Sequence, residues 1–139
     1  MKLMIVGSDK IYSIENFYVK YLREAGVEVN HFTAQRFFYD YYHQGLLHKL
    51  MFKAGLSGIL KRINRLFEKE LKAFSPDVVW VFKGMEIYPR SLRRAKEMGI
   101  KLVNFNGDHP FVFSGKGSGN KNVTDSIPLY DVHLTYNSA

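Results

Sequence analysis

The sequence predicts an α/β domain with an open, Rossmann-like parallel sheet of about five strands and flanking helices. Short apolar runs of strand length alternate with helical patterns, which is typical of βαβ units. Residues 78–82 are continuously apolar, as in a strand buried on both faces of a parallel sheet. Twice, at Gly26 and at Gly99, a glycine follows a helical pattern and precedes a strand. With 139 residues, the chain is predicted to form a single domain over residues 1–139.

The first βαβ unit begins with a strand at residues 3–6, which ends at Gly7-Ser8. A helix follows, with Ser13 as its expected N-cap and Gly26 at the C′ position. A second strand is expected at residues 27–32. The helix is predicted because six apolar residues recur at helical spacing on one face: Ile14, Phe17, Tyr18, Tyr21, Leu22 and Ala25.

The remaining elements follow the same logic. Residues 44–74 form a long connection that breaks at Gly55 and Gly58, and its second half has an apolar stripe opposite a basic face. After the strand at residues 78–82, Pro89 is expected in the first turn of a helix. Strands are predicted at residues 102–105 and 132–136. Residues 112–126 are rich in glycine, serine and asparagine, which predicts a mobile loop.

Composition excludes several classes of protein. The chain has no cysteine, which excludes disulfide scaffolds, thiolate metal sites and cysteine catalysis. Its hydrophobic fraction of 46% is too high for general disorder. No apolar run approaches the roughly 18 residues of a membrane span. The apolar stretch at the N-terminus is too short for a signal peptide. We therefore predict a cytoplasmic chain. The histidines lack the spacing of metal ligands, and no metal site is predicted.

The net charge of +7 predicts an anionic partner, and the charge is unevenly distributed. Residues 43–74 carry a net +5 and residues 83–103 a net +4. An ordinary solvated helix face explains the basic residues of the first segment. Docking on an anionic membrane leaflet is the alternative. Nucleic acid is not expected as a partner, because no recognition motif is present. The basic residues in question are Lys61, Arg62, Arg65 and Lys69.

Polar residues follow three of the predicted strands at their carboxyl ends, where doubly wound domains bind ligands. Gly7 and Ser8 follow the first strand, either as a turn that a ligand approaches closely or as a simple tight turn. Lys83 and Gly84 follow the third strand, where lysine is suited to a phosphate or a sugar hydroxyl. No GxGxxG fingerprint is present to support a dinucleotide cofactor.

The fourth strand is followed by the densest polar cluster of the chain, which begins at Asn106 and ends at Pro110. His109 has an ordinary pKa near ~6.5 and is a candidate general base. Asp108 is suited to orient the imidazole or to bind a hydroxyl group, and Pro110 restricts the backbone of His109. The alternative is a turn in which Asp108 binds nearby backbone amides.

Three segments together resemble the amino-terminal half of CgeB-like glycosyltransferases, which are related to the families of the GT-B fold. The family pattern runs from Pro-Asp through an apolar strand to Lys-Gly, then from lysine through a strand to Asp-x-Pro, then from Tyr-Asp into a strand. In this chain the pattern occupies residues 75–84 (SPDVVWVFKG), 99–110 (GIKLVNFNGDHP) and 130–137 (YDVHLTYN).

This resemblance implies a two-domain enzyme that transfers a sugar from a nucleotide-diphosphate sugar to a sugar or lipid-linked acceptor, as in cell-envelope polysaccharide or lipopolysaccharide synthesis. The chain would be the acceptor-side domain, without a cofactor of its own, and a carboxyl-terminal domain would hold the donor. By position, Gly7 and Asn137 would line the interdomain cleft and Lys83-Gly84 the acceptor side. Asp108 and His109 would approach the transferred sugar.

Other expectations remain open beside the resemblance. The family often has a second acidic residue where this chain has His109, which leaves the catalytic group undecided. A sequence that stops directly after its fifth strand suggests the front part of a longer polypeptide, inactive by itself. The alternatives are a non-catalytic nucleotide- or sugar-binding module and a peripheral membrane adaptor. His133, in the middle of the last strand, is expected to be structural.

Overall fold

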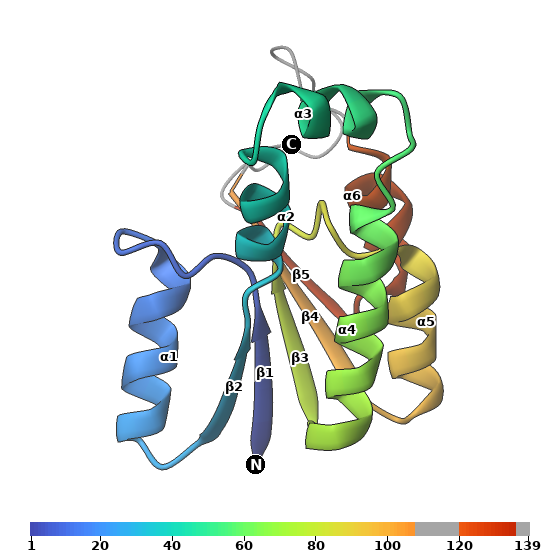
Figure 1. Ribbon diagram of the computed structural model, residues 1–139. Helices are drawn as coiled ribbons and strands as arrows, with labels where there is room; N and C mark the ends of the chain where they lie inside the picture. The colour runs from blue at the N-terminus through green and yellow to red at the C-terminus, as the bar shows by residue number, and fades with distance from the viewer. Residues whose placement is uncertain (108–119, 136–139) are drawn as a thin grey trace.

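The computed structural model describes residues 1–107 and 120–135, and within them five strands form one parallel sheet in the order β2-β1-β3-β4-β5 (Figure 1). A strand is present at each of the five places where the sequence predicts one, which confirms the Rossmann-like α/β class. The strands are β1 (Lys2–Val6), β2 (Glu28–Phe32), β3 (Val78–Phe82), β4 (Lys101–Asn106) and β5 (Val132–Thr135).

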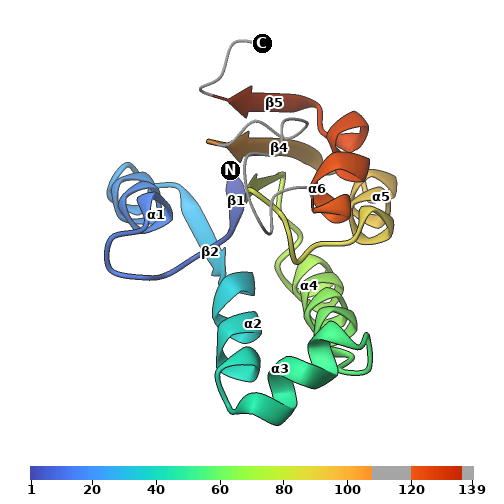
Figure 2. The same cartoon turned by 90° about the horizontal axis from the view of Figure 1, so that it is seen from above.

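The helices lie on both faces of the sheet (Figure 2). From β1 the chain moves to β2 on one side, and from β3 it moves to β4 and β5 on the other. Connections between parallel strands are right-handed. Two connections that run in opposite directions along the sheet therefore place their helices on opposite faces. One face carries α1 (Ile14–Glu24). The other carries α4 (Ile59–Phe74), reached through α2 (Ala34–Tyr42) and α3 (Leu46–Lys53), and then α5 (Pro89–Glu97), α6 (Lys121–Ser126) and a short 3₁₀ turn, η1 (Ile127–Leu129).

Strand alternation divides the core in two. The larger half lies under α4 and α5, where Ile63, Phe67, Leu71 and Leu92 pack on the strands. The strand residues that they cover are Met4, Val6, Val79, Val81 and Leu102. The smaller half lies under α1 and consists of Leu3, Ile5, Val19, Val29 and Phe82.

The apolar stripe of α1 is mostly exposed, although the helix begins and ends as predicted. Glu15 and Val19 are the buried residues of this helix, and Tyr18 packs on Trp80 with a centroid distance of 4.8 Å. One helix thus covers the sheet beside β1, and the same face remains open at Val132 and Leu134 of β5. The exposed members of the stripe are Ile14, Phe17, Tyr18 and Tyr21.

The prediction of a loop through residues 112–126 is wrong for its second part. Residues 121–126 form α6, and Asn120 caps it by accepting hydrogen bonds from the backbone N–H groups of Asn122 and Val123. This side-chain cap holds a helix of only six residues, which is too short to show a periodic pattern. Residues 112–119 lie outside the described residues. In the described ranges no helix is long and apolar enough to span a bilayer.

Two aspartates fix neighbouring strands at the amino edge of the sheet. The Asp77 carboxylate accepts a hydrogen bond from Lys2 N at 2.7 Å, and the Asp131 carboxylate accepts one from Leu102 N at 2.8 Å. Each aspartate also donates its own N–H to the carbonyl of the same residue. Because a slip of one residue would move every side chain to the other face, these paired bonds help to set the register of β1 with β3 and of β4 with β5.

Asn64 connects α4 with the segment between β3 and α5. Its side chain is almost fully buried. The amide donates to the carbonyl of Glu86 at 2.9 Å and accepts from the backbone N–H of Tyr88 at 2.8 Å. A second donated bond reaches Leu60 O within the helix. This side chain therefore satisfies backbone groups that would otherwise be buried without partners.

Replacing Asn64 by leucine should lower the free energy of unfolding by about 2–3 kcal/mol, because it leaves buried backbone groups unsatisfied. Urea denaturation measures the loss. The control is Asn30→Leu, whose amide binds the half-buried Glu70 carboxylate and whose loss should cost about 1 kcal/mol. Equal losses in the two variants would contradict the role assigned to Asn64.

Candidate functional site

A small cavity opens at the carboxyl edge of the sheet where the strand order reverses. β1 pairs with β2 on one side and with β3 on the other, so the connections leave this point in opposite directions. Doubly wound domains bind ligands at such switch points. The cavity measures about 150 Å³. We call it the switch-point cavity, and it is lined by Ile14, Glu15, Gln35, Phe82, Lys83, Phe105, Asn106 and Gly107.

Gly7 and Ser8 lie beside this cavity and hold the buried carboxylate of Glu15. A Cβ at Gly7 would stand 2.4 Å from Glu15 Oε1, so only glycine leaves room for that oxygen. The same oxygen accepts the backbone N–H of Ser8 at 2.9 Å. Ser13 is the N-cap residue of α1, as predicted, but its hydroxyl caps no backbone N–H of the helix and donates to Ser8 Oγ at 2.8 Å. The direct requirement for Gly7 is therefore the Glu15 carboxylate.

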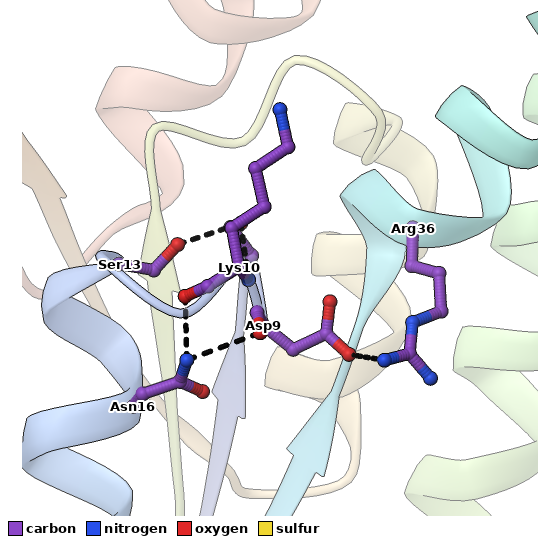
Figure 3. A network of polar contacts seen from close by, with 6 residues as sticks. Asp9, Lys10, Ser13, Asn16 and Arg36 are labelled. Carbon is purple, nitrogen blue, oxygen red and sulfur yellow. Dashed lines mark hydrogen bonds and ion pairs between the residues drawn. The ribbon is translucent and has the colours of Figure 1, made fainter. Parts of the chain in front are cut away.

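The loop after β1 is tied to both neighbouring helices (Figure 3). The side-chain amide of Asn16 donates to the carbonyls of Asp9 and Lys10 at 3.1 and 2.6 Å. Asp9 forms an ion pair with Arg36 of α2, and the Lys10 ammonium lies 4.3 Å from the ring centroid of Tyr39. These contacts hold one wall of the carboxyl edge in a fixed position.

Lys83 and Gly84 both have left-handed backbone conformations, with φ of +64° and +97°. For lysine this conformation costs about 1–2 kcal/mol. The surrounding chain holds it in place, because Lys83 N donates to Phe105 O at 2.7 Å and the Asn104 amide donates to Lys83 O at 3.2 Å. A strained non-glycine residue that lines a cavity at a switch point is a typical functional position.

Asn104 is a residue that the sequence analysis missed. Its amide also donates to Val81 O at 3.0 Å, and its carbonyl oxygen lies 2.8 Å from His133 Nδ1. His133 thus has a hydrogen-bond partner within the sheet, which agrees with the structural role expected for it. Burial raises the pKa of Tyr130, and a hydrogen bond with Asn104 opposes this shift. The sequence signal that could have revealed Asn104 is its position in the strand. It shares one face of β4 with Leu102 and Asn106, and an amide on this buried face needs hydrogen-bond partners.

Two further titratable groups near this edge were also missed. Burial raises the pKa of Glu86, while its own backbone N–H and the charge of Lys83 lower it. Burial lowers the pKa of His31, while Asp9 raises it. The Nε2 atom of His31 is buried and has no hydrogen-bond partner in the described part of the chain. Neither residue belongs to a local motif, because tertiary packing alone buries them.

The other predicted site residues fall into two groups, one at the carboxyl ends of the strands and one on the basic face of α4. Asn106 is the last residue of β4, is buried and lines the switch-point cavity with Lys83. Asp108, His109 and Asn137 lie outside the described residues. The four basic residues of the second group lie on the solvent-exposed side of α4, away from the cavity: Lys61, Arg62, Arg65 and Lys69.

Comparison with known proteins gives no further assignment. No protein-family model matches the chain, and no curated protein matches it. Within residues 1–107 and 120–135, no three histidine or carboxylate side chains gather in a group able to hold a metal ion. The geometry therefore defines a Rossmann-like domain with a small cavity at its switch point, lined by both apolar and polar residues.

Replacing Gly7 by alanine should expel the Glu15 carboxylate and cost about 1–3 kcal/mol of stability, the range for overpacking a buried site. Urea denaturation of Gly7→Ala, Glu15→Ala and the double variant measures the coupling. In the Glu15→Ala background, Gly7→Ala should cost little, because the clashing oxygen is absent. An equal loss in both backgrounds would mean that Glu15 is not what requires the glycine.

Replacing Glu86 by glutamine should stabilise the protein at pH 7. Below pH 4.5, the ordinary pKa of this carboxyl, it is neutral in both the folded and unfolded states. As pH rises, the unfolded chain ionises first, so the wild type loses stability until its raised folded pKa is passed. The gain from Glu86→Gln should therefore vanish towards pH 4. Exposed Glu24→Gln is the control, and a gain independent of pH would exclude this explanation.

Proposed function

We propose that this chain is the amino-terminal, acceptor-side domain of a GT-B-type glycosyltransferase that uses a nucleotide-diphosphate sugar. The observation that carries the proposal is the switch-point cavity, together with the resemblance of three sequence segments. Glu15, Gln35 and Asn106 bring carboxylate and amide groups to its wall, and these groups suit sugar hydroxyls. Phe105, which is partly exposed, adds aromatic surface for the apolar face of a sugar ring.

The size of the cavity fits a site that is completed by a second domain. Complete ligand sites usually enclose ~300–1,000 Å³, whereas this cavity measures about 150 Å³. In a two-domain transferase, closure brings the donor against the acceptor and excludes water, so that the acceptor hydroxyl attacks the sugar. In this proposal a second, carboxyl-terminal domain holds the donor.

The reaction requires few groups from this domain. The acceptor hydroxyl attacks the anomeric carbon, its proton passes to a general base, and the nucleotide diphosphate leaves. We assign the base to His109, the candidate base of the sequence, with Asp108 to orient its imidazole. Lys83, which lines the cavity, is proposed to meet anionic or hydroxyl groups of the acceptor.

The experiment has two parts. An immunoblot of native lysate measures the mass of the gene product, which should be about two to three times the 16.2 kDa of this chain. That product is then assayed for sugar transfer from nucleotide-diphosphate sugars. His109→Ala and Asp108→Ala should each greatly reduce turnover while circular dichroism remains unchanged.

Lys83→Gly tests the role of the switch-point cavity in acceptor binding most directly. Glycine adopts the left-handed conformation readily, so this change removes the ammonium and relieves backbone strain. We expect higher stability with weaker acceptor binding, and exposed Lys101→Gly serves as the control. A native product of about this chain's own mass that binds sugar without turnover would replace the transferase with a non-catalytic binding module.

A further inference from the structure

Helix α3 and the residues after it expose leucines that have no cover in the described structure. None of the residues of α3 is buried. Leucine side chains at this density on an exposed helix are unusual in a protein surface that contacts only water. Their exposed fractions are 74% for Leu46, 66% for Leu47, 54% for Leu50 and 72% for Leu56.

The leucines face outward because the other side of α3 is anchored. Phe52 packs edge-on against Phe38 of α2 with a centroid distance of 4.9 Å. The ring of Tyr42 contacts Phe52 at 5.9 Å, and the Lys49 ammonium lies 5.5 Å from the ring centroid of Tyr42. The aromatic residues therefore fix the orientation of the helix and leave its leucine face exposed.

The segment that carries these leucines has only positive formal charges, and the nearest carboxylate before it is Asp40 of α2. Residues 41–67 contain five lysines and arginines and no aspartate or glutamate. Exposed leucines among cations without carboxylates are characteristic of surfaces that lie in the membrane interface. The leucines supply buried apolar area, and the cations meet anionic headgroups. We call the set the leucine–lysine surface: Leu46, Leu47, Leu50, Leu56, Lys53 and Lys61.

The apolar stripe of α4 cannot play the same part. Its members Ile59, Ile63, Phe67 and Leu71 lie in the core against the sheet. The exposed side of this helix thus offers charge without apolar area. The leucines of α3 supply the component that the basic residues of α4 lack.

The leucine–lysine surface lies at the end of the molecule to which the strands point. In Figure 1, α3 stands at the end of the molecule to which β1 and β3 point, and Figure 2 shows it displaced to the side, beside α2 and α4.

We propose that the leucine–lysine surface docks this protein on an anionic phospholipid bilayer. The proposal does not rest on the transferase function. A second copy of the chain is a poorer occupant, because pairing two such surfaces would bring like charges together. A bilayer complements both components, since its headgroups are anionic and its acyl region is apolar.

Cosedimentation of the 139-residue chain with phospholipid vesicles tests the proposal. Vesicles contain phosphatidylcholine alone or with phosphatidylglycerol, and we expect strong binding only with phosphatidylglycerol. Leu47→Ser with Leu50→Ser should weaken binding by at least about tenfold, since several buried CH₂ groups are lost. The control changes Val132 and Leu134 to serine, which are exposed apolar residues on the open sheet face.

A second pair of variants tests the charges. Lys53→Gln with Lys61→Gln should weaken binding by about fivefold per charge removed. Lys20→Gln with Lys101→Gln, which lie elsewhere on the surface, should leave binding unchanged. Circular dichroism verifies that each variant is folded.

Several outcomes would overturn the proposal. Absence of binding to phosphatidylglycerol vesicles does so directly. Unchanged binding by the double leucine variant would leave only a nonspecific charge effect. Sedimentation velocity that shows a dimer dissociated by the same leucine changes would assign the surface to a second copy.

Discussion

The parallel pairing of β1 with both β2 and β3 is the constraint on which the rest of the structure depends. From this central strand the connections leave in opposite directions, and the right-handed crossover rule assigns their helices to opposite faces. The reversal separates the chain segments above the carboxyl edge and leaves the switch-point cavity between them. It also explains why, among the described residues, one face of the sheet has a single helix while the other has several.

Local signals predicted the elements well because each depends on few neighbouring residues. Gly26 and Gly99 both have the left-handed conformation expected after a helix, and Pro89 occupies the first turn of α5. Helix α6 was missed because its cap depends on one asparagine within a polar segment. The outward face of α1 was not evident, since periodicity shows which residues share a face and not whether anything covers it.

The candidate site could be predicted only by position. Strand ends located Gly7, Lys83 and Asn106 at one edge, and the structure places the last two in the same cavity. Glu86 and Asn104 could not be found in this way, because their roles depend on groups distant in sequence. Asp108 and His109 stay predictions outside the described residues.

Part of the resemblance to glycosyltransferases reflects the sheet rather than chemistry. Asp77 and Asp131 belong to its Pro-Asp and Tyr-Asp motifs, yet both bind backbone groups at the amino edge, opposite the cavity. Such motifs indicate a common way of aligning parallel strands. Residues at the carboxyl edge, above all Lys83, are the ones that line the candidate ligand site.

The attachment of β5 has a consequence for local opening. This edge strand has exposed Val132 and Leu134, and Asp131 helps to hold its start. The hydrogen bond from Leu102 lowers the pKa of the Asp131 carboxyl from its ordinary 3.8. The Asp131 carboxylate therefore contributes to stability above pH 3.8. This contribution is lost as the pH falls through the lowered pKa of the folded protein. In strong acid this hydrogen bond is weakened, and release of β5 would present the unpaired backbone of β4 as a template for intermolecular pairing.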